Sequence, residues 1–155
     1  MRAAVFIGMG SNQDPRNHLA SGAAYLREIL EDPVFSGCYR SESRMSGADY
    51  LNMAVFGYTC MSWDKLTVSL KDIEKRCGRV RNGNDECSLD LDLLWYDGIR
   101  VENRLPHPDL WLRSYVAVPV AELCSREKMA MPGDPPDGAW LRKAATELII
   151  TDFRI

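Results

Sequence analysis

The sequence lacks several features that mark whole classes of proteins. No stretch approaches the length of a transmembrane helix, and the first apolar run, Ala3 to Met9, is too short for a secretory signal. The five cysteines are odd in number and never form a C-x-x-C pair, which argues against a disulfide framework and a zinc knuckle. Basic residues number 19 against 22 acidic ones, so nucleic acid and anionic membranes are not expected as main partners. We therefore expect a soluble protein of the reducing cytoplasm.

Familiar nucleotide-binding loops and catalytic nucleophiles are also missing. Gly8-Met9-Gly10 begins like the dinucleotide motif G-x-G-x-x-G, but position 13 is glutamine, and nothing matches the G-x-x-x-x-G-K-[ST] loop. The chain has no G-x-S-x-G motif and only two histidines, His18 and His107. No cysteine has an evident activating neighbour. Covalent catalysis is therefore disfavoured, and any nucleotide must be held in another way.

Two aspartates on one expected strand are the most informative feature that is present. In an extended segment from Ser88 to Leu94, alternate leucines point into a core while Asp90 and Asp92 share the other face. Adjacent carboxylates repel each other, and hard oxygen ligands suit Mg²⁺, which usually takes one or two carboxylates plus substrate phosphates. The nearby arginines of Gly78-Arg79-Val80-Arg81 would contact further phosphate oxygens. The alternative for the aspartates is an edge strand with one face in water.

The order of the expected elements indicates the fold. Strands are predicted at residues 3–9, 34–41 and 50–58 and at the two aspartates, and helices from Asp14-Pro15 to about residue 30 and from Ser62 to about Cys77. The order strand, helix, strand, strand, helix, strand is the signature of an α+β ferredoxin-like sandwich. Its sheet is mostly antiparallel with helices packed on one side, which leaves the other face for a ligand at Asp90 and Asp92. Further helices are predicted at 116–123 and 140–148, all within a single domain of 155 residues.

Six short segments carry a resemblance to a known family. They are Gly10-Ser11-Asn12, Tyr39-Arg40-Ser41, Asp49-Tyr50-Leu51-Asn52, Glu74 with Gly78-Arg79-Val80-Arg81, Leu89-Asp90-Leu91-Asp92, and Pro106-His107 with Arg113. In this order and spacing, over roughly residues 3 to 125, the chain resembles 6-hydroxymethyl-7,8-dihydropterin pyrophosphokinases (HPPK) of folate biosynthesis, which share the ferredoxin-like fold. The resemblance implies transfer of pyrophosphate from ATP to a pterin alcohol, which leaves AMP. It implies pterin and ATP as partners of a monomer or small homo-oligomer.

The resemblance also implies roles for the matching residues. Asp90 and Asp92 match the aspartates that hold two Mg²⁺ ions between the ATP phosphates and the pterin hydroxyl, where positioning and charge neutralisation lower the barrier. The residues implied on the pterin side are Gly10, Ser41, Tyr50, Asn52 and Tyr115, where the Asn52 amide satisfies donor and acceptor edges of the heterocycle and Tyr115 stacks on it. Those implied on the nucleotide side are Glu74, Arg79, Arg81, His107 and Arg113, and Arg79 and Arg81 are also assigned to catalysis.

Two loops depart from the family pattern. Where the family carries an Arg-Trp-Gly-Pro-Arg-like stretch, residues 82–88 are shorter, lack those cations and the tryptophan, and include Asp85 and Glu86. A Pro-Pro-x-Gly-like turn is replaced by residues 42–47, which include Arg44. Because loop closure assembles such sites, we expect slow turnover with the deficit in kcat, unless Arg44 supplies the missing cation.

Two functions remain open on these residues. The first is a Mg²⁺- and ATP-dependent pterin pyrophosphokinase, and the second is a diverged relative that binds a pterin or nucleotide without transferring pyrophosphate. Retention of two adjacent like charges at Asp90 and Asp92 favours the enzyme. A ferredoxin-like nucleic-acid binder would need the basic charge and stacking motifs that the chain lacks.

Overall fold

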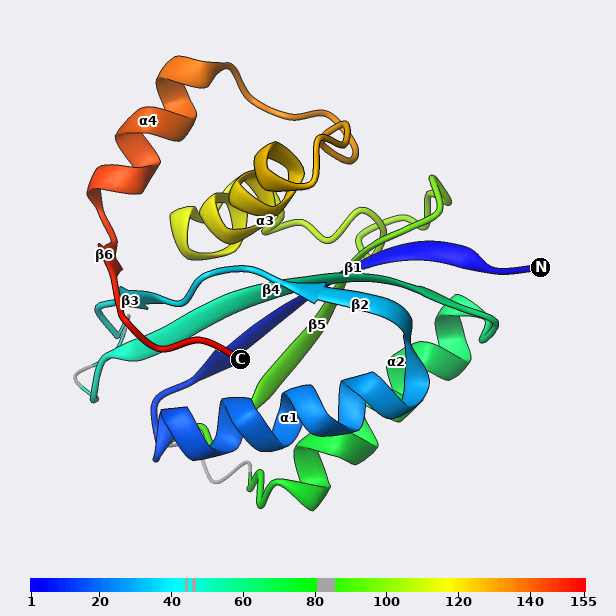
Figure 1. Ribbon diagram of the computed structural model, residues 1–155, viewed down its shortest axis with the longest axis horizontal. Helices are drawn as coiled ribbons and strands as arrows, with labels where there is room; N and C mark the ends of the chain where they lie inside the picture. Colours follow the sequence, from blue (N-terminus) through cyan, green and yellow to red (C-terminus); the bar gives the residue numbers. More distant parts are fainter. Residues whose placement is uncertain (44, 46, 81–85) are drawn as a thin grey trace.

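The described residues form a mixed architecture of one sheet with helices packed against it, and Figure 1 shows their arrangement. The computed structural model describes residues 1–43, 45, 47–80 and 86–155. In chain order its elements are β1 (Ala3–Ser11), α1 (Pro15–Ile29), β2 (Glu31–Phe35), β3 (Tyr39–Ser41), β4 (Tyr50–Thr59), α2 (Trp63–Arg76), β5 (Asp90–Tyr96), α3 (Ser114–Arg126), α4 (Gly138–Thr146) and β6 (Ile149–Ile150). The strands lie in the order β5-β1-β4-β3-β6, with β2 also paired to β4, and each of these pairs is antiparallel. The predicted α+β ferredoxin-like class is confirmed.

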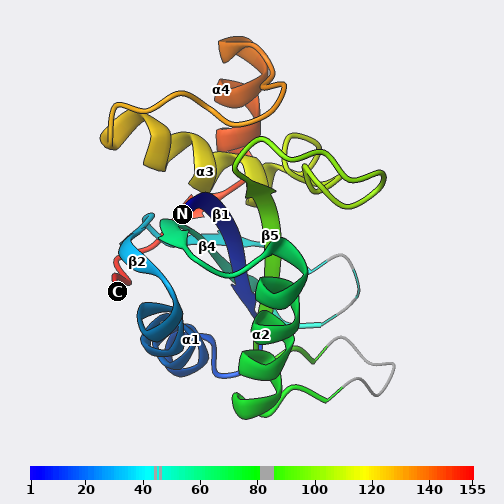
Figure 2. The ribbon, with the colours of Figure 1, turned by 90° about the vertical axis from the view of Figure 1, so that its right-hand side faces the viewer.

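Helices cover both faces of this sheet (Figure 2). The pair α1 and α2 lies on one face, over a core that includes Ile7, Val55 and Leu91. Residues that point the other way, such as Phe6 and Ala54, pack with Val120 and Leu123 of α3, and α4 packs beside α3. The prediction of helices on one side thus holds for α1 and α2, while α3 and α4 lie opposite. The reason is that the central strands are apolar on both faces, which requires cover on both.

The predicted strand 34–41 consists of two strands, β2 and β3, which pair with different parts of β4. Between them, Ser36 continues the ladder partly through its side chain: the Ala54 N–H donates to Ser36 Oγ at 2.8 Å, and the Ser36 N–H donates to the Ala54 carbonyl at 2.8 Å. The register of β3 places Tyr39 opposite Asn52 and Ser41 opposite Tyr50. The interruption therefore brings Ser41 to the same end of the sheet as the polar residues that open β4.

The edge strand β5 carries the two aspartates, and its register decides which way they face. Asp90 lies opposite Gly10 and Asp92 opposite Gly8 on β1, and a β-bulge follows at Leu94. Leu93 points into the core under α2 and Leu94 to the α3 face, as alternation requires, and because of the bulge Trp95 packs on the α3 face as well. Asp90 and Asp92 share one face, as alternation predicts, but the start of α3 lies over that face, which the sequence pattern predicted to be free of helices.

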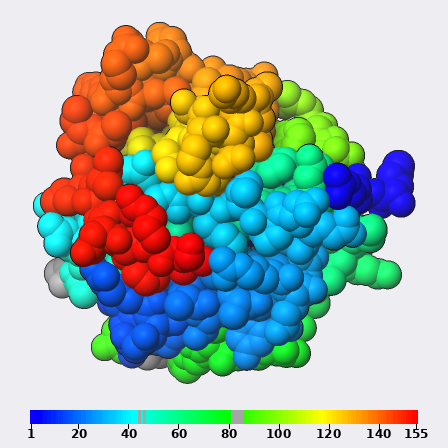
Figure 3. Space-filling view, viewed as in Figure 1, coloured from blue at the N-terminus to red at the C-terminus, as the bar shows by residue number. Residues whose placement is uncertain are grey.

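The C-terminal segment closes the opposite edge of the sheet. After β6 pairs with β3, the Thr151 N–H donates to the Cys38 carbonyl at 3.0 Å, and Phe153 packs against the core under α1. Asp152 is ion-paired with Arg16 of α1 at 2.9 Å, which fixes the tail on the surface between α1 and α4 (Figure 3). None of the helices in the described part of the chain is long and apolar enough to cross a bilayer.

Candidate functional site

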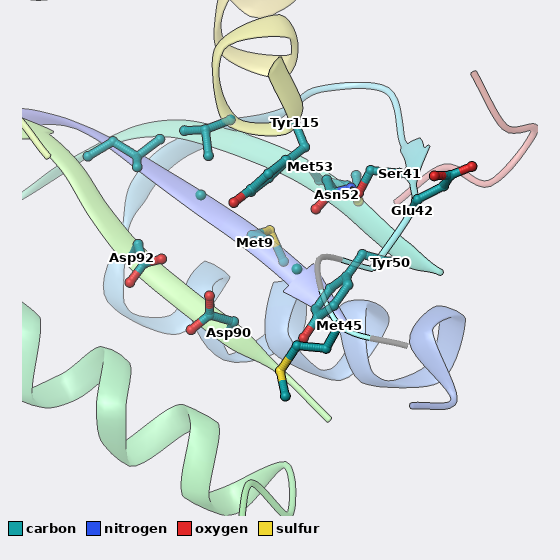
Figure 4. Close-up of a pocket in the computed structure, with 14 residues that line it drawn as sticks. Met9, Ser41, Glu42, Met45, Tyr50, Asn52, Met53, Asp90, Asp92 and Tyr115 are labelled. Carbon is teal, nitrogen blue, oxygen red and sulfur yellow. Dashed lines mark hydrogen bonds between the residues drawn. The ribbon is translucent and has the colours of Figure 1, made fainter. Parts of the chain in front are cut away.

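A cavity of about 510 Å³ opens between the sheet and the start of α3 (Figure 4). Its lining includes Asp90, Asp92, Gly10, Ser41, Tyr50, Asn52 and Tyr115, and therefore both aspartates and every residue predicted for the pterin side. Gly8 and Gly10 of β1 form part of the floor. A Cβ on Gly10 would lie 3.6 Å from Asn52 Oδ1 and 3.8 Å from the Tyr50 ring. The absence of a side chain at Gly10 thus leaves the floor open beside the amide and the aromatic ring.

One end of the cavity is aromatic, and Glu42 lies beside Ser41 at its rim. Tyr115 from α3 and Tyr50 from β4 lie on opposite sides of it, with Asn52 between them (Figure 4). Asn52 is buried, and its Nδ2 donates to the Tyr39 carbonyl at 3.1 Å and to Ser41 Oγ at 2.8 Å. Both amide protons are therefore used within the protein, which leaves the carbonyl oxygen as an acceptor near the cavity floor. The structure thus refines the expectation that this amide serves both edges of a heterocycle, because its donor edge is engaged.

The other end of the cavity is acidic. Arg79 Nη1 lies 3.5 Å from Asp90 Oδ1, and Lys71 Nζ lies 3.9 Å from Asp92 Oδ1. Burial, followed by the charge of Asp90, raises the pKa of Asp92 from its ordinary 3.8 to about 7, although 39% of its side-chain surface stays exposed. Since the cavity crowds negative charge that the neighbouring cations only partly offset, it calls for a further cation.

The acidic end fits Mg²⁺ by the chemistry of its donors. Two carboxylates in a hollow offer hard oxygen ligands, which this ion takes together with water and substrate phosphate. Within the described residues no group of three or more His, Cys, Asp or Glu side chains could hold a metal. The arrangement therefore suits an ion that arrives with a phosphate-bearing ligand rather than one caged by protein alone.

Side chains of α2 and of the segment after it line the outer edge of β5. Glu74 Oε1 accepts from the Leu91 N–H at 2.8 Å and from Lys71 Nζ at 3.0 Å. Arg79 Nη1 donates to the Leu89 carbonyl at 2.8 Å and contacts Cys87 Sγ at 2.8 Å. Among the described residues, neither Glu74 nor Arg79 lines this cavity or the smaller cleft that meets it at Asp92. These two predicted nucleotide-side residues thus fix the strand that carries the aspartates, and Arg79 also contacts one of them.

Lys71 is a charged residue of the site that the sequence interpretation missed. It contacts both Glu74 and Asp92, and it also donates to the Leu91 carbonyl at 3.2 Å. A signal was present in the sequence, since Lys71 lies one helical turn before Glu74 and therefore on the same face of α2. The sequence does not show that this face of α2 lies against the edge of β5.

A second cleft of about 240 Å³ shares Asp92 with the first cavity, and Lys71 and His107 also line it. Its apolar wall is provided by Trp63, Leu70, Leu91, Leu93 and Leu105. His107 Nδ1 accepts from the Asp109 N–H at 3.1 Å, which places the ring proton of the neutral form on Nε2. Burial lowers the pKa of His107, so the imidazole is a neutral hydrogen-bond donor at neutral pH.

The remaining predicted residues lie elsewhere. Arg113 immediately precedes α3, with Nε 3.7 Å from Asp109 Oδ1, and among the described residues it lines neither cavity. Its Nε is buried without a hydrogen-bond partner in the described part of the chain. Arg81, Arg44 and residues 82–85 of the altered loop lie outside the described residues.

Asn12 joins the segments next to both altered loops. Its Oδ1 accepts from the Cys87 N–H at 2.7 Å, and its own N–H donates to the Cys87 carbonyl at 3.0 Å. Its Nδ2 also donates to the Ala48 carbonyl at 3.4 Å. The Gly10-Ser11-Asn12 segment, singled out from the sequence, thus ties the start of β5 to the approach to β4.

Comparisons with known proteins point to one family. The family model of 7,8-dihydro-6-hydroxymethylpterin-pyrophosphokinase (HPPK) matches residues 6–125. Two similar curated proteins are 2-amino-4-hydroxy-6-hydroxymethyldihydropteridine pyrophosphokinases. The one from Haemophilus influenzae is 38% identical over 130 residues, which are 78% of this chain and 81% of the relative. The one from Bacillus subtilis is 29% identical over 135 residues, which are 81% of each chain.

A solved structure supports the fold. The chain is similar, with a TM-score of 0.62 and 11% identity, to a crystal structure of an HPPK-DHPS in complex with substrates. The match covers 92% of this chain and 43% of that one. At this identity the likeness concerns the architecture alone.

Proposed function

Because this chain belongs to the 7,8-dihydro-6-hydroxymethylpterin-pyrophosphokinase family, we propose that it transfers pyrophosphate from ATP to 6-hydroxymethyl-7,8-dihydropterin. In this reaction the pterin hydroxyl oxygen attacks the β-phosphorus of ATP and loses its proton. The bond from the β-phosphorus to the oxygen that bridges it to the α-phosphorus breaks, so that AMP leaves. The proposal rests on a single cavity. Tyr50, Tyr115 and the Asn52 amide line one end of it, and Asp90 and Asp92 line the other.

The aromatic end suits the pterin. Tyr50 and Tyr115 offer ring faces from opposite sides, between which a flat heterocycle can stack. Asn52 offers its carbonyl oxygen to an N–H of the ring, and Ser41 Oγ, which accepts from Asn52, has its own proton to donate. Gly10 leaves room on the floor. The hydroxymethyl group would then point across β1, from Asn52 on β4 toward Asp90 and Asp92 on β5.

The acidic end suits the metal and the nucleotide phosphates. Asp90 and Asp92 would hold Mg²⁺, which when bound neutralises phosphate charge and orients the triphosphate. Arg79 and Glu74 keep β5 in place through Leu89 and Leu91, so that both carboxylates stay directed into the cavity. The second cleft, which meets the first at Asp92, suits the nucleotide, with the His107 Nε2 proton as a donor to phosphate oxygen.

The reaction products test this proposal. The purified chain is incubated with ATP, Mg²⁺ and 6-hydroxymethyl-7,8-dihydropterin, and nucleotides and pterins are separated by chromatography. We expect AMP and a pterin diphosphate in equal amounts, which Asp92→Asn abolishes. Asp97→Asn, an equal charge change in the exposed turn after β5, should retain the activity. Formation of ADP would contradict the proposed reaction, and binding of both substrates without AMP would favour the binding protein that the sequence left open.

A further inference from the structure

We propose that Lys71 is a phosphate-binding residue of this site, which acts as the counter-ion of Asp92 until Mg²⁺ and a nucleotide replace it there. The inference rests on the proposed function, because it assigns a residue of α2 to the polyphosphate of that reaction. The starting observation is that the Lys71 ammonium contacts two carboxylates. One belongs to Glu74, which binds the backbone of β5, and the other to Asp92 at the acidic end of the cavity.

The contacts of Lys71 with the protein leave part of its donor capacity unused. Its Nζ donates to Glu74 Oε1 at 3.0 Å and to the Leu91 carbonyl at 3.2 Å, which anchors it at the edge of β5. The distance of 3.9 Å to Asp92 Oδ1 is that of an ion pair and is too long for a hydrogen bond. An ammonium has three donors, so among the described residues one remains for an anion beside Asp92.

The position of Lys71 also fits an anion that enters from the second cleft. Lys71, Asp92 and His107 all line that cleft, so a neutral N–H donor and an ammonium lie around the carboxylate that would bind the metal. The Lys71 side chain is 38% exposed, which leaves its charged end accessible to a ligand. By contrast, Arg79, the cation that contacts Asp90, is only 15% exposed and is held by Leu89 and Cys87.

The arrangement predicts an exchange of partners when ligands bind. In the ligand-free protein Lys71 offsets part of the negative charge at Asp92. When Mg²⁺ neutralises that carboxylate, the ammonium near it turns to a phosphate oxygen, which replaces the lost attraction. Lys71 should therefore oppose the binding of Mg²⁺ alone and favour the binding of Mg²⁺ together with a polyphosphate. A purely structural lysine would do neither.

The test measures these opposite effects by titration calorimetry. Lys71→Met removes the charge and keeps the apolar stem, and Lys71→Gln removes the charge and keeps a hydrogen-bond donor. Lys75→Met makes the same change of charge on the exposed side of α2 and serves as the control. The probes are Mg²⁺ alone, α,β-methylene-ATP with Mg²⁺, and the pterin. Circular dichroism and pterin affinity verify that each variant is folded.

Both Lys71 variants should bind α,β-methylene-ATP with Mg²⁺ roughly 10-fold or more weakly, the worth of a charge-assisted hydrogen bond. They should bind Mg²⁺ alone roughly 2- to 5-fold more tightly, since an opposing exposed charge is gone. Lys75→Met should change neither affinity, and Lys71→Arg should restore the affinity for the nucleotide analogue.

If Lys71→Gln binds the analogue as tightly as the wild type does, this role of Lys71 is wrong and the proposed function stays intact. A wild type that binds pterin and Mg²⁺ but no analogue would overturn both. Weaker binding of Mg²⁺ alone by Lys71→Gln would also overturn the role as counter-ion.

Discussion

The raised pKa of Asp92 should make the stability of the ligand-free protein fall as the pH rises. Its folded-state pKa of about 7 lies above the ordinary 3.8, so between these values the folded protein keeps a proton that the unfolded chain has lost. Where the folded state binds more protons, the free energy of unfolding decreases with increasing pH. The contribution of Asp92 is therefore fully present below about pH 4 and lost as the pH rises through about 7.

The size of this effect follows from the shift and the exposure of the side chain. A proton retained over about three pH units would correspond to about 4 kcal/mol. Because 39% of the Asp92 side chain is exposed, solvent screens the charge, and we expect about 1 to 2 kcal/mol. Asp92→Asn, which stays neutral at every pH, should therefore be more stable than the wild type at pH 8 and gain little at pH 4.

Urea unfolding of the metal-free protein between pH 4 and 8 measures this difference. Asp97→Asn, which makes the same chemical change in an exposed turn, is the control and should follow the wild type. Added Mg²⁺ should stabilise the wild type at pH 8 and have little effect at pH 5, where it competes with the proton. If Asp92→Asn and the wild type lose stability equally between pH 5 and 8, the assignment of the proton to Asp92 is wrong.

Two further substitutions test the aromatic end of the cavity. Asn52→Ala should weaken pterin binding by about 1 to 3 kcal/mol and also lower the free energy of unfolding, since Tyr39 and Ser41 lose a donor; calorimetry and urea unfolding measure both, and an unchanged pterin affinity would place the pocket elsewhere. Gly10→Ala should weaken pterin binding roughly tenfold or more with little effect on folding, because the added methyl contacts protein atoms at 3.6 Å and beyond yet fills the floor. Gly37→Ala, with a nearest atom at 3.6 Å and a place outside the cavity, is its control, and equal losses in both variants would refute the steric argument.

The parts of the fold and site that follow from local periodicity could be predicted. Alternation along a strand placed Asp90 and Asp92 together, and the same rule placed Tyr50 beside Asn52. The apolar run Ala3–Met9 carried a signal that was not used, because a strand that is apolar on both faces requires cover on both. The position of α3 over Phe6 and Leu94 is the consequence.

Contacts between distant segments could not be predicted in this way. The role of Glu74 on the edge of β5 depends on the rotation of α2 about its own axis, which the sequence constrains only through its apolar stripe. The division of strand 34–41 depends on one serine hydroxyl that takes a place in the ladder of β4. The hydrogen bonds from the Asn52 amide to β3 depend on the register of β3, which is set by the break between β2 and β3 at Ser36.

The side chains along the outer edge of β5 also bear on how this protein avoids aggregation. An edge strand exposes unpaired N–H and carbonyl groups to which a strand of another molecule can add. Here Glu74 caps the Leu91 N–H, Lys71 the Leu91 carbonyl and Arg79 the Leu89 carbonyl, so the strand that holds both aspartates offers no continuous template there. These three charged residues thus keep the edge from intermolecular strand pairing, and replacing all three would leave backbone groups of β5 unpaired and favour self-association.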